Sequence, residues 1–160
     1  MIKKILDILQ KEARMPAEKI ATRLGVRAEE VAETIEKLEK DHVILGYKAI
    51  INPEKSTSEL IHSFIEVQVT PQRDKGFDDV AERLYKFPEV KTLYLMSGGY
   101  DLLLIVEGKT LLEVAQFVSE KLAVLEGVRG TRTHFLLKKY KEDGVIFKEQ
   151  PEHQRLPVSP

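Results

Sequence analysis

The sequence predicts an α+β protein in which an N-terminal winged helix-turn-helix precedes a ferredoxin-like βαββαβ sandwich. Short apolar patterns of helical spacing occupy the first forty residues, whereas the later part alternates strand and helix patterns. That later part also repeats itself at an offset of 38 positions, where Val80 matches Val118 and Val90 matches Val128. A split βαβ repeat of this kind produces four antiparallel strands with both helices on one face.

Composition limits the number of domains and the classes of function that the chain can have. The 160 residues suffice for one compact domain or two small ones, and the formal net charge is −1. Any nucleic-acid binding must therefore come from local placement of charge. There is no cysteine, which excludes disulfides and thiolate metal sites. Neither an apolar signal region nor a run of membrane-spanning length is found, so we expect a cytoplasmic protein.

The first unit, residues 1–52, is expected to fold as a helix-turn-helix with a wing. Pro16 suits the first turn of the second helix, and Gly25 suits its end. Residues 43–51 are expected to form a short β-ribbon, the wing, which Asn52 and Pro53 close. The apolar positions of the three helices are Ile2, Ile5, Leu6 and Leu9, then Ile20, Ala21 and Leu24, and finally Val31, Ile35 and Leu38.

The third helix of such a unit would enter the major groove of DNA. Its outward positions are mostly acidic, and carboxylates are repelled by the phosphates that supply most of the affinity. A glutamate can nevertheless accept from cytosine N4. Two interpretations of the third helix therefore stay open: it reads DNA, or its acidic face is simply solvated. The candidate DNA-binding residues are Arg27, Glu30, Thr34 and Lys37.

The polar residues 53–59 indicate a linker, and residues 60–140 are assigned to the second domain. Strands are expected at residues 61–69 and 128–140, with a loop at 71–76, and Thr110 is expected to cap the second helix. Residues 141–160 are interpreted as a C-terminal tail, and its last ten residues, which include three prolines, are expected to be extended or mobile. The uncovered sheet face would expose apolar residues and so favours sheet-to-sheet dimerisation, through Phe64, Leu93 or Leu95, Phe135 and Leu137.

A hairpin is predicted around Gly98 and Gly99, because two β-rich runs flank this pair of glycines. The apolar second run places the hairpin in the middle of a covered sheet. Free backbone N–H groups of the turn and the Asp101 carboxylate offer what a zwitterionic amino acid needs. Alternatively, the glycines only turn the chain and Asp101 caps the turn. Replacing Asp101 by alanine is expected to abolish effector response and leave the fold intact.

Several short motifs follow one another along the chain: Leu24-Gly25-Val26, Ile35-Glu36-Lys37-Leu38-Glu39, Val43-Ile44-Leu45-Gly46-Tyr47, Asn52-Pro53, Ser97-Gly98-Gly99-Tyr100-Asp101-Leu102-Leu103-Leu104, Leu125-Glu126-Gly127-Val128 and Thr131-Arg132-Thr133. In this order and spacing, they resemble the motifs of the Lrp/AsnC, or feast/famine, transcription regulators of bacteria and archaea. The similarity covers about residues 1–140 and would make the second domain one of the RAM type.

The resemblance implies a homodimer, assembled into tetramers or octamers, that binds operator DNA and senses an amino acid or a related small molecule. It places the effector in a cleft between subunits, lined by Gly98, Gly99, Tyr100 and Asp101, with Thr131 and Thr133 as a second wall. The departures from the family pattern lie in the DNA-binding unit, where Arg27 replaces a Ser or Thr cap, Thr34 and Glu36 stand at often basic positions, and His42 replaces a frequent glycine.

Two alternatives of other classes remain. The same pair of domains occurs in sirohaem decarboxylase subunits, but such a tetrapyrrole site needs a cluster of His, Arg and Tyr, and the four histidines are scattered. An amino-acid-sensing interaction module that has lost DNA binding would explain the acidic third helix. We find no nucleophile–base pair, metal-ligand spacing or phosphate-binding glycine loop, and therefore expect neither an enzyme, a metal nor a cofactor.

Overall fold

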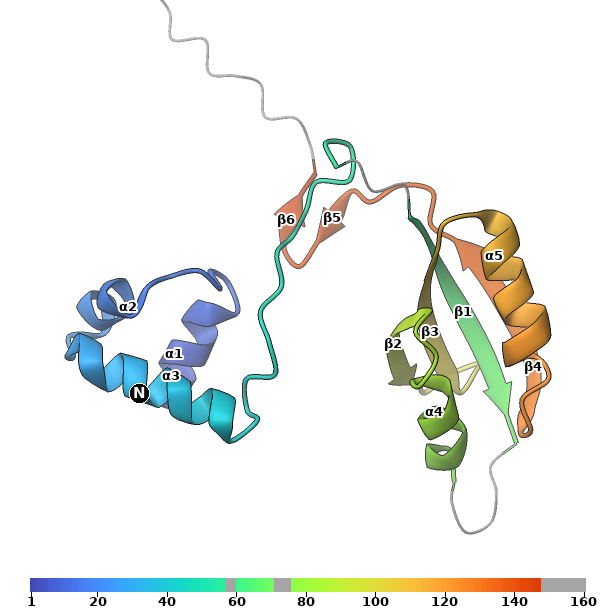
Figure 1. Cartoon of the computed structure of the whole chain (residues 1–160), viewed down its shortest axis with the longest axis horizontal. Coiled ribbons are helices and arrows are strands. Elements are labelled where there is room, and N and C mark those ends of the chain that lie inside the picture. Colours follow the sequence, from blue (N-terminus) through green and yellow to red (C-terminus); the bar gives the residue numbers. More distant parts are fainter. Residues whose placement is uncertain (57–59, 71–75, 148–160) are drawn as a thin grey trace, which may run out of the picture. The chain divides into compact units, whose positions relative to one another are not determined.

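The computed structural model describes residues 1–56, 60–70 and 76–147. The chain divides into two compact units, Met1–Ile51 and Asn52–Pro160 (Figure 1). Part of the expected linker (57–59), most of the expected loop (71–75) and most of the expected tail (148–160) lie outside the described residues. Within the described ranges, none of the helices has the length and hydrophobicity required to cross a bilayer.

The first unit is a three-helix helix-turn-helix, as the sequence predicts. Its helices are α1 (Ile2–Leu9), α2 (Ala17–Leu24) and α3 (Ala28–Lys40). Gly25 follows α2 with a φ of 69°, the left-handed backbone that allows the tight turn into α3. The apolar stripes meet in a small core that contains Ile5, Leu9, Met15, Ile20, Ala21 and Val31.

The β-ribbon predicted over residues 43–51 is absent, and this expectation was wrong. After α3, His42 adopts a φ of 58° and turns the chain away from the helix. The N–H groups of Val43 and Ile44 then donate to the carbonyl oxygen of Leu38, at 2.9 and 3.0 Å. The chain beyond runs without strand structure, because the described part of this unit contains no second strand to complete a ladder.

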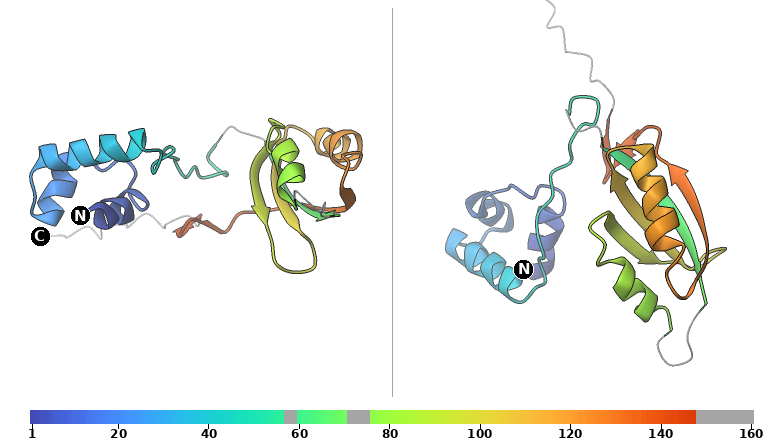
Figure 2. Two further views of the ribbon diagram at one scale, coloured as in Figure 1. Left: turned by 90° about the horizontal axis from the view of Figure 1, so that it is seen from below. Right: turned by 45° about the vertical axis from the view of Figure 1, so that its right-hand side comes forward.

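The second unit is a four-stranded antiparallel sheet with the order β2-β3-β1-β4. Helices α4 and α5 lie on the same face of this sheet (Figures 1 and 2). This is the predicted ferredoxin-like arrangement. In chain order the elements are β1 (Ile61–Val69), α4 (Asp78–Leu84), β2 (Val90–Leu95), β3 (Leu102–Gly108), α5 (Leu111–Gln116), the π-helical turn η1 (Phe117–Leu122) and β4 (Val128–Phe135).

The covered face of the sheet carries the core. Alternate residues of β1 and β3 point toward the helices, since side chains along a strand alternate between faces. Phe87 closes one end by packing edge-on against Phe117, with ring centroids 5.6 Å apart. The buried core consists of Ile65, Val67, Val69, Val80, Leu84, Leu102, Leu104, Val106, Phe117 and Leu122.

The open face differs from the sequence expectation. Leu93 pairs with Leu104 and packs on the covered side, because a bulge between Val90 and Thr92 shifts the register of β2. Phe135 pairs with the buried Ser63 and is likewise on the covered side. The hairpin is also less central than predicted, because β3 is an inner strand and β2 an edge strand. By register, the open face carries His62, Phe64, Glu66, Gln68, Thr92, Tyr94, Leu103, Ile105, Glu107, Arg132 and His134.

The C-terminal part of the described chain contains a hairpin where the sequence analysis predicts only strand and tail. β4 ends at Phe135 and not at Tyr140. Pairing with β1 continues by one further backbone hydrogen bond, from the Leu136 N–H to the carbonyl oxygen of His62 at 2.9 Å. Strands β5 (Lys141–Glu142) and β6 (Val145–Ile146) then pair across an Asp-Gly turn with positive φ. Asp-Gly between two short strands is a hairpin signal that the sequence-based prediction overlooked.

Candidate functional site

The loop between β2 and β3, residues 96–101, contains the predicted effector turn. The hairpin is confirmed, but the connection is longer than a tight Gly-Gly turn. The Met96 N–H donates to the carbonyl oxygen of Asp101 at 2.8 Å and closes the loop. Gly98 adopts a φ of 153°, which side-chain-bearing residues rarely reach. The loop therefore requires glycine at this position.

Asp101 ties this loop to the end of β1. Its backbone N–H donates to Val67 O at 3.1 Å, and its Oδ2 accepts from the N–H of Val69 at 2.8 Å. The register of β1 against β4 shifts between Gln68 and Val69, so the carboxylate accepts from the backbone beside a bulge. Of the two interpretations of Asp101, the structural one is thus directly visible, and an alanine at this position would remove the acceptor of the Val69 N–H.

A small cavity of about 150 Å³ lies beside the loop. It brings together Gly99, Tyr100 and Thr131, which the sequence predicts as site residues. Gly98, Asp101 and Thr133 are not part of its lining. The register pairs Thr133 with the buried Ile65, which turns its side chain toward the covered face of the sheet.

Charged and polar side chains of the sheet complete this cavity, and the sequence-based prediction missed them. They are Glu66 and Gln68 from β1 and Arg132 from β4. Glu66 lies between two basic groups, with Arg132 Nη1 at 3.5 Å and His134 Nε2 at 3.1 Å. Gln68 Nε2 donates to the carbonyl oxygen of Gly99 at 3.4 Å. The alternation of β1 places Glu66 and Gln68 on one face, but only the strand register brings Arg132 next to them.

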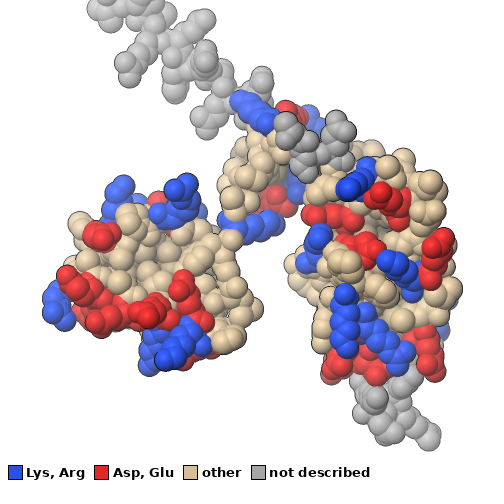
Figure 3. Space-filling view, in the orientation of Figure 1, with Lys and Arg blue, Asp and Glu red and all other residues tan. Residues whose placement is uncertain are grey.

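The predicted DNA-binding residues lie along one side of α3. Arg27 is its N-cap residue, and Glu30, Thr34 and Lys37 follow at helical spacing. Arg27 and Lys37 are exposed, whereas Glu30 and Thr34 are half-buried. The Thr34 hydroxyl donates to the carbonyl oxygen of Glu30 at 2.7 Å. Acidic side chains follow the length of α3 in the space-filling view (Figure 3).

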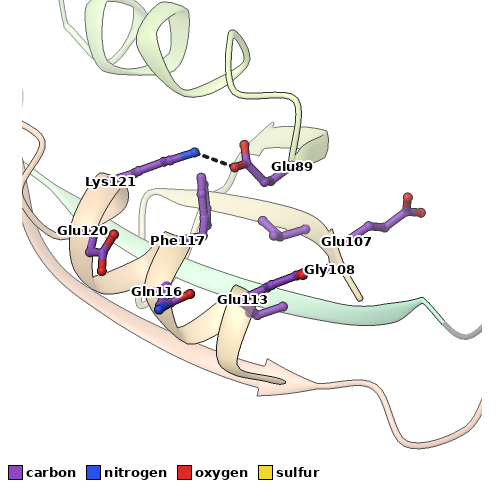
Figure 4. A pocket seen from close by; sticks show the side chains of 10 residues that line it. Glu89, Glu107, Gly108, Glu113, Gln116, Phe117, Glu120 and Lys121 are labelled. Carbon is purple, nitrogen blue, oxygen red and sulfur yellow. Dashed lines mark hydrogen bonds and ion pairs between the residues drawn. The ribbon is translucent and has the colours of Figure 1, made fainter. Parts of the chain in front are cut away.

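Another hollow lies between the end of β3 and α5–η1, with a volume of about 260 Å³ (Figure 4). Lys121 Nζ lies 2.6 Å from Glu89 Oε1 and 5.8 Å from the centre of the Phe87 ring. The hydrogen bond from Lys121 lowers the pKa of Glu89 below its ordinary value, against the opposing effect of desolvation. Among the described residues, no group of His, Cys, Asp or Glu side chains is arranged to hold a metal ion. The hollow therefore presents an ion pair that ties η1 to the chain before β2.

Family models match both units of the chain. The AsnC-type helix-turn-helix domain matches residues 1–39, and the Lrp/AsnC ligand binding domain matches residues 62–146. The second match contains β1 to β6 and with them the loop and cavity described above.

Whole-chain relatives agree with these models. An uncharacterized HTH-type transcriptional regulator of Bacillus subtilis, YugG, is 47% identical over 157 residues, which are 98% of this chain and 95% of the relative. The HTH-type transcriptional regulator LrpA of Pyrococcus horikoshii is 32% identical over 137 residues, covering 86% of this chain and 94% of LrpA.

Solved structures include a transcriptional regulator of Neisseria meningitidis in complex with L-methionine. It matches with a TM-score of 0.70 and 26% identity, over 88% of this chain and 90% of that one. A feast or famine regulatory protein of M. tuberculosis, also complexed with L-methionine, matches with a TM-score of 0.70 and 25% identity, over 91% of this chain and 96% of that one.

Proposed function

Because the chain belongs to the Lrp/AsnC family of helix-turn-helix transcriptional regulators, we propose that it binds operator DNA through Met1–Ile51 and an amino acid or related small molecule through its second unit. The curated relatives are regulators and not enzymes, so the sirohaem decarboxylase alternative is set aside. The observation that carries the effector proposal is the cavity beside the 96–101 loop, where Arg132 and Glu66 lie next to each other.

Both ends of a free amino acid find partners at this cavity. The Arg132 guanidinium suits the α-carboxylate, and the Glu66 carboxylate suits the α-ammonium group. Backbone groups of Gly98, Gly99 and Tyr100 add further donors and acceptors, while Asp101 holds the loop in position. Thr131 on β4 borders the cavity as the proposed second wall, whereas Thr133 turns to the covered face of the sheet and takes no part in it. L-methionine, which is bound in both solved structures described above, is the first effector to test.

The effector site is proposed to lie between subunits of a homodimer that assembles further into tetramers or octamers. The open face of the sheet supports this, because Phe64, Tyr94, Leu103 and Ile105 place apolar surface on it. A second copy of the same face would cover this surface. An effector that prefers one assembly state would then change how paired α3 helices match successive major grooves. In each of them, Arg27, Glu30, Thr34 and Lys37 are the proposed DNA-facing residues.

Calorimetric titration of the full chain with L-methionine and the other proteinogenic amino acids tests the effector site. We expect Arg132→Gln to weaken binding roughly 10- to 100-fold, since it removes charge-assisted hydrogen bonds. Arg129→Gln is the matched control, because Arg129 is an exposed arginine of the same strand outside the cavity lining. Equal affinities for wild type and Arg132→Gln would contradict the site, and no binding of any amino acid would contradict the sensor function.

DNA binding is tested by titrating the upstream DNA of the chain's own gene at several salt concentrations, with and without the bound amino acid. A steep salt dependence that the amino acid shifts is the expected result. No binding even at low salt would instead favour a protein partner for the acidic α3.

A further inference from the structure

The first unit contains a groove that the third helix does not form. It has a volume of about 680 Å³ and lies between the corner that joins α1 to α2 and the chain at residues 47–50. Five basic side chains line it: Lys11, Arg14, Lys19, Arg23 and Lys48. The one acidic side chain of the lining is Glu12, which lies 3.6 Å from Arg23.

The basic charge of this groove is largely uncompensated. Among the residues that the structure describes, Lys11, Arg14, Lys19 and Lys48 have no ion-pair partner. All four side chains are exposed, and none takes part in the core of the unit. They are therefore available to an anionic partner without any rearrangement of the fold.

The groove and α3 divide the charge of the unit between them. Basic atoms gather over the corner between α1 and α2, while acidic atoms follow α3 (Figure 3). Phosphate neutralisation supplies most of the affinity of a DNA-binding protein, and base edges supply the sequence information. An acidic helix can read base edges, but it cannot neutralise phosphates.

We propose that this groove holds the sugar–phosphate backbone of duplex DNA and supplies the electrostatic affinity that α3 lacks. The inference rests on the operator binding proposed above and assigns its phosphate contacts to the α1–α2 corner and Lys48. Met15 and Pro16 give the groove an apolar floor, against which deoxyribose can pack between successive phosphates. The exposed lysines and arginines then contact the phosphates on either side of it.

The test compares two triple variants of the full chain that remove the same charge. The groove variant removes three cations from the groove and carries Arg14→Gln, Lys19→Gln and Lys48→Gln. The control triple removes three exposed cations elsewhere in the unit and carries Lys3→Gln, Lys4→Gln and Lys40→Gln. Each protein is titrated against a fluorescein-labelled random-sequence duplex by anisotropy over a series of salt concentrations. Thermal unfolding followed by circular dichroism verifies that both variants are folded, and Lys48→Gln alone serves as a variant outside all helices.

For the groove variant we expect the slope of log K against log salt to become shallower by about 0.9 for each phosphate that is no longer neutralised, or about 2.7 for each bound subunit. Lys48→Gln should reduce the slope by about 0.9, and the control triple should keep a slope close to that of the wild type. Equal slopes for the groove variant and the wild type, or equal reductions in the two triples, would overturn the phosphate groove while operator binding stands. A wild type that fails to bind the duplex at low salt would overturn both.

Discussion

At Asp101 a single carboxylate oxygen holds the β2–β3 loop against the end of β1. This oxygen accepts a hydrogen bond from the N–H of Val69. Val69 is only 2% exposed, so water cannot take the place of the carboxylate as the acceptor. Asp101→Ala should therefore lower the free energy of unfolding by about 1–3 kcal/mol, because it leaves a buried donor unpaired. Asp101→Asn keeps an oxygen at this place and should be less destabilising. Urea unfolding measures both variants, and equal destabilisation would contradict this role.

A second residue-scale prediction concerns the ion pair of Glu89 and Lys121. The pKa of Glu89 is lowered in the folded chain, chiefly by the hydrogen bond from Lys121. A carboxyl group with a lowered folded pKa stabilises the protein above its unfolded pKa, and this contribution is lost as the pH falls through the folded pKa. The wild type should therefore unfold at a higher temperature than Glu89→Gln at pH 7, and the difference should shrink toward about pH 3.

Differential scanning calorimetry at the two pH values measures that difference. Glu120→Gln is the matched control, because Glu120 is an exposed carboxylate of the same hollow. Both partners of the pair are partly exposed, so the effect should be modest and should decrease with added salt. A stability difference that is the same at both pH values would refute the interpretation.

At the scale of elements, the end of β3 and the start of α5 approach each other at Gly108. A Cβ built on Gly108 would lie 2.8 Å from Cγ2 of Val114, which is buried on α5. Gly108→Ala should destabilise the fold by roughly 1–3 kcal/mol, because α5 must shift to make room. Gly46→Ala is the control, since nothing lies within 4 Å of its Cβ position. If chemical denaturation gave the same change in stability for Gly108→Ala and Gly46→Ala, backbone entropy and not packing against Val114 would determine the effect.

The start of α5 shows how far sequence reasoning reaches at this scale. Thr110 was predicted as the helix cap, and its Oγ1 indeed accepts from the N–H of Glu113 at 3.1 Å. A cap is local chemistry, which the order of a few residues determines. The π-helical turn that follows, Phe117–Leu122, has no such local signal. The bulge in β2 likewise has no recognisable sequence signal. It places Leu93 on the covered face of the sheet, whereas the sequence analysis expected this residue on the open face.

At the scale of the whole molecule, the open face of the sheet is the surface through which we expect the chain to dimerise. Phe64 lies near its middle, on the inner strand β1. Because a buried carboxylate without a partner is strongly disfavoured, Phe64→Glu should convert the dimer into monomers. Sedimentation velocity measures the result, and Val124→Glu, at a position that is 70% exposed in the second unit, is the control. A Phe64→Glu chain that sediments as the wild type does would exclude this face as the interface.

Sequence motifs predicted the whole architecture better than the details of the site. The order of elements follows from periodicity, which each segment carries by itself. The cavity instead depends on two strands that are distant in the chain, β1 and β4, whose register places Glu66 opposite Arg132. Thr131 and Thr133 lie two residues apart on β4 and pair with the buried Val67 and Ile65, so both side chains belong to the covered face, and only Thr131 borders the cavity.

The position of β1 in the sheet has a consequence for synthesis of the chain. β1 leaves the ribosome first of the four strands, yet it pairs with both β3 and β4. Ile65 finds its partners only when Leu104 and then Thr133 have been made. Until then the nascent β1 carries apolar residues and two unpaired edges, which are templates for aggregation. Translation pauses before β4 is complete should therefore require protection by chaperones, whereas pauses after it should not.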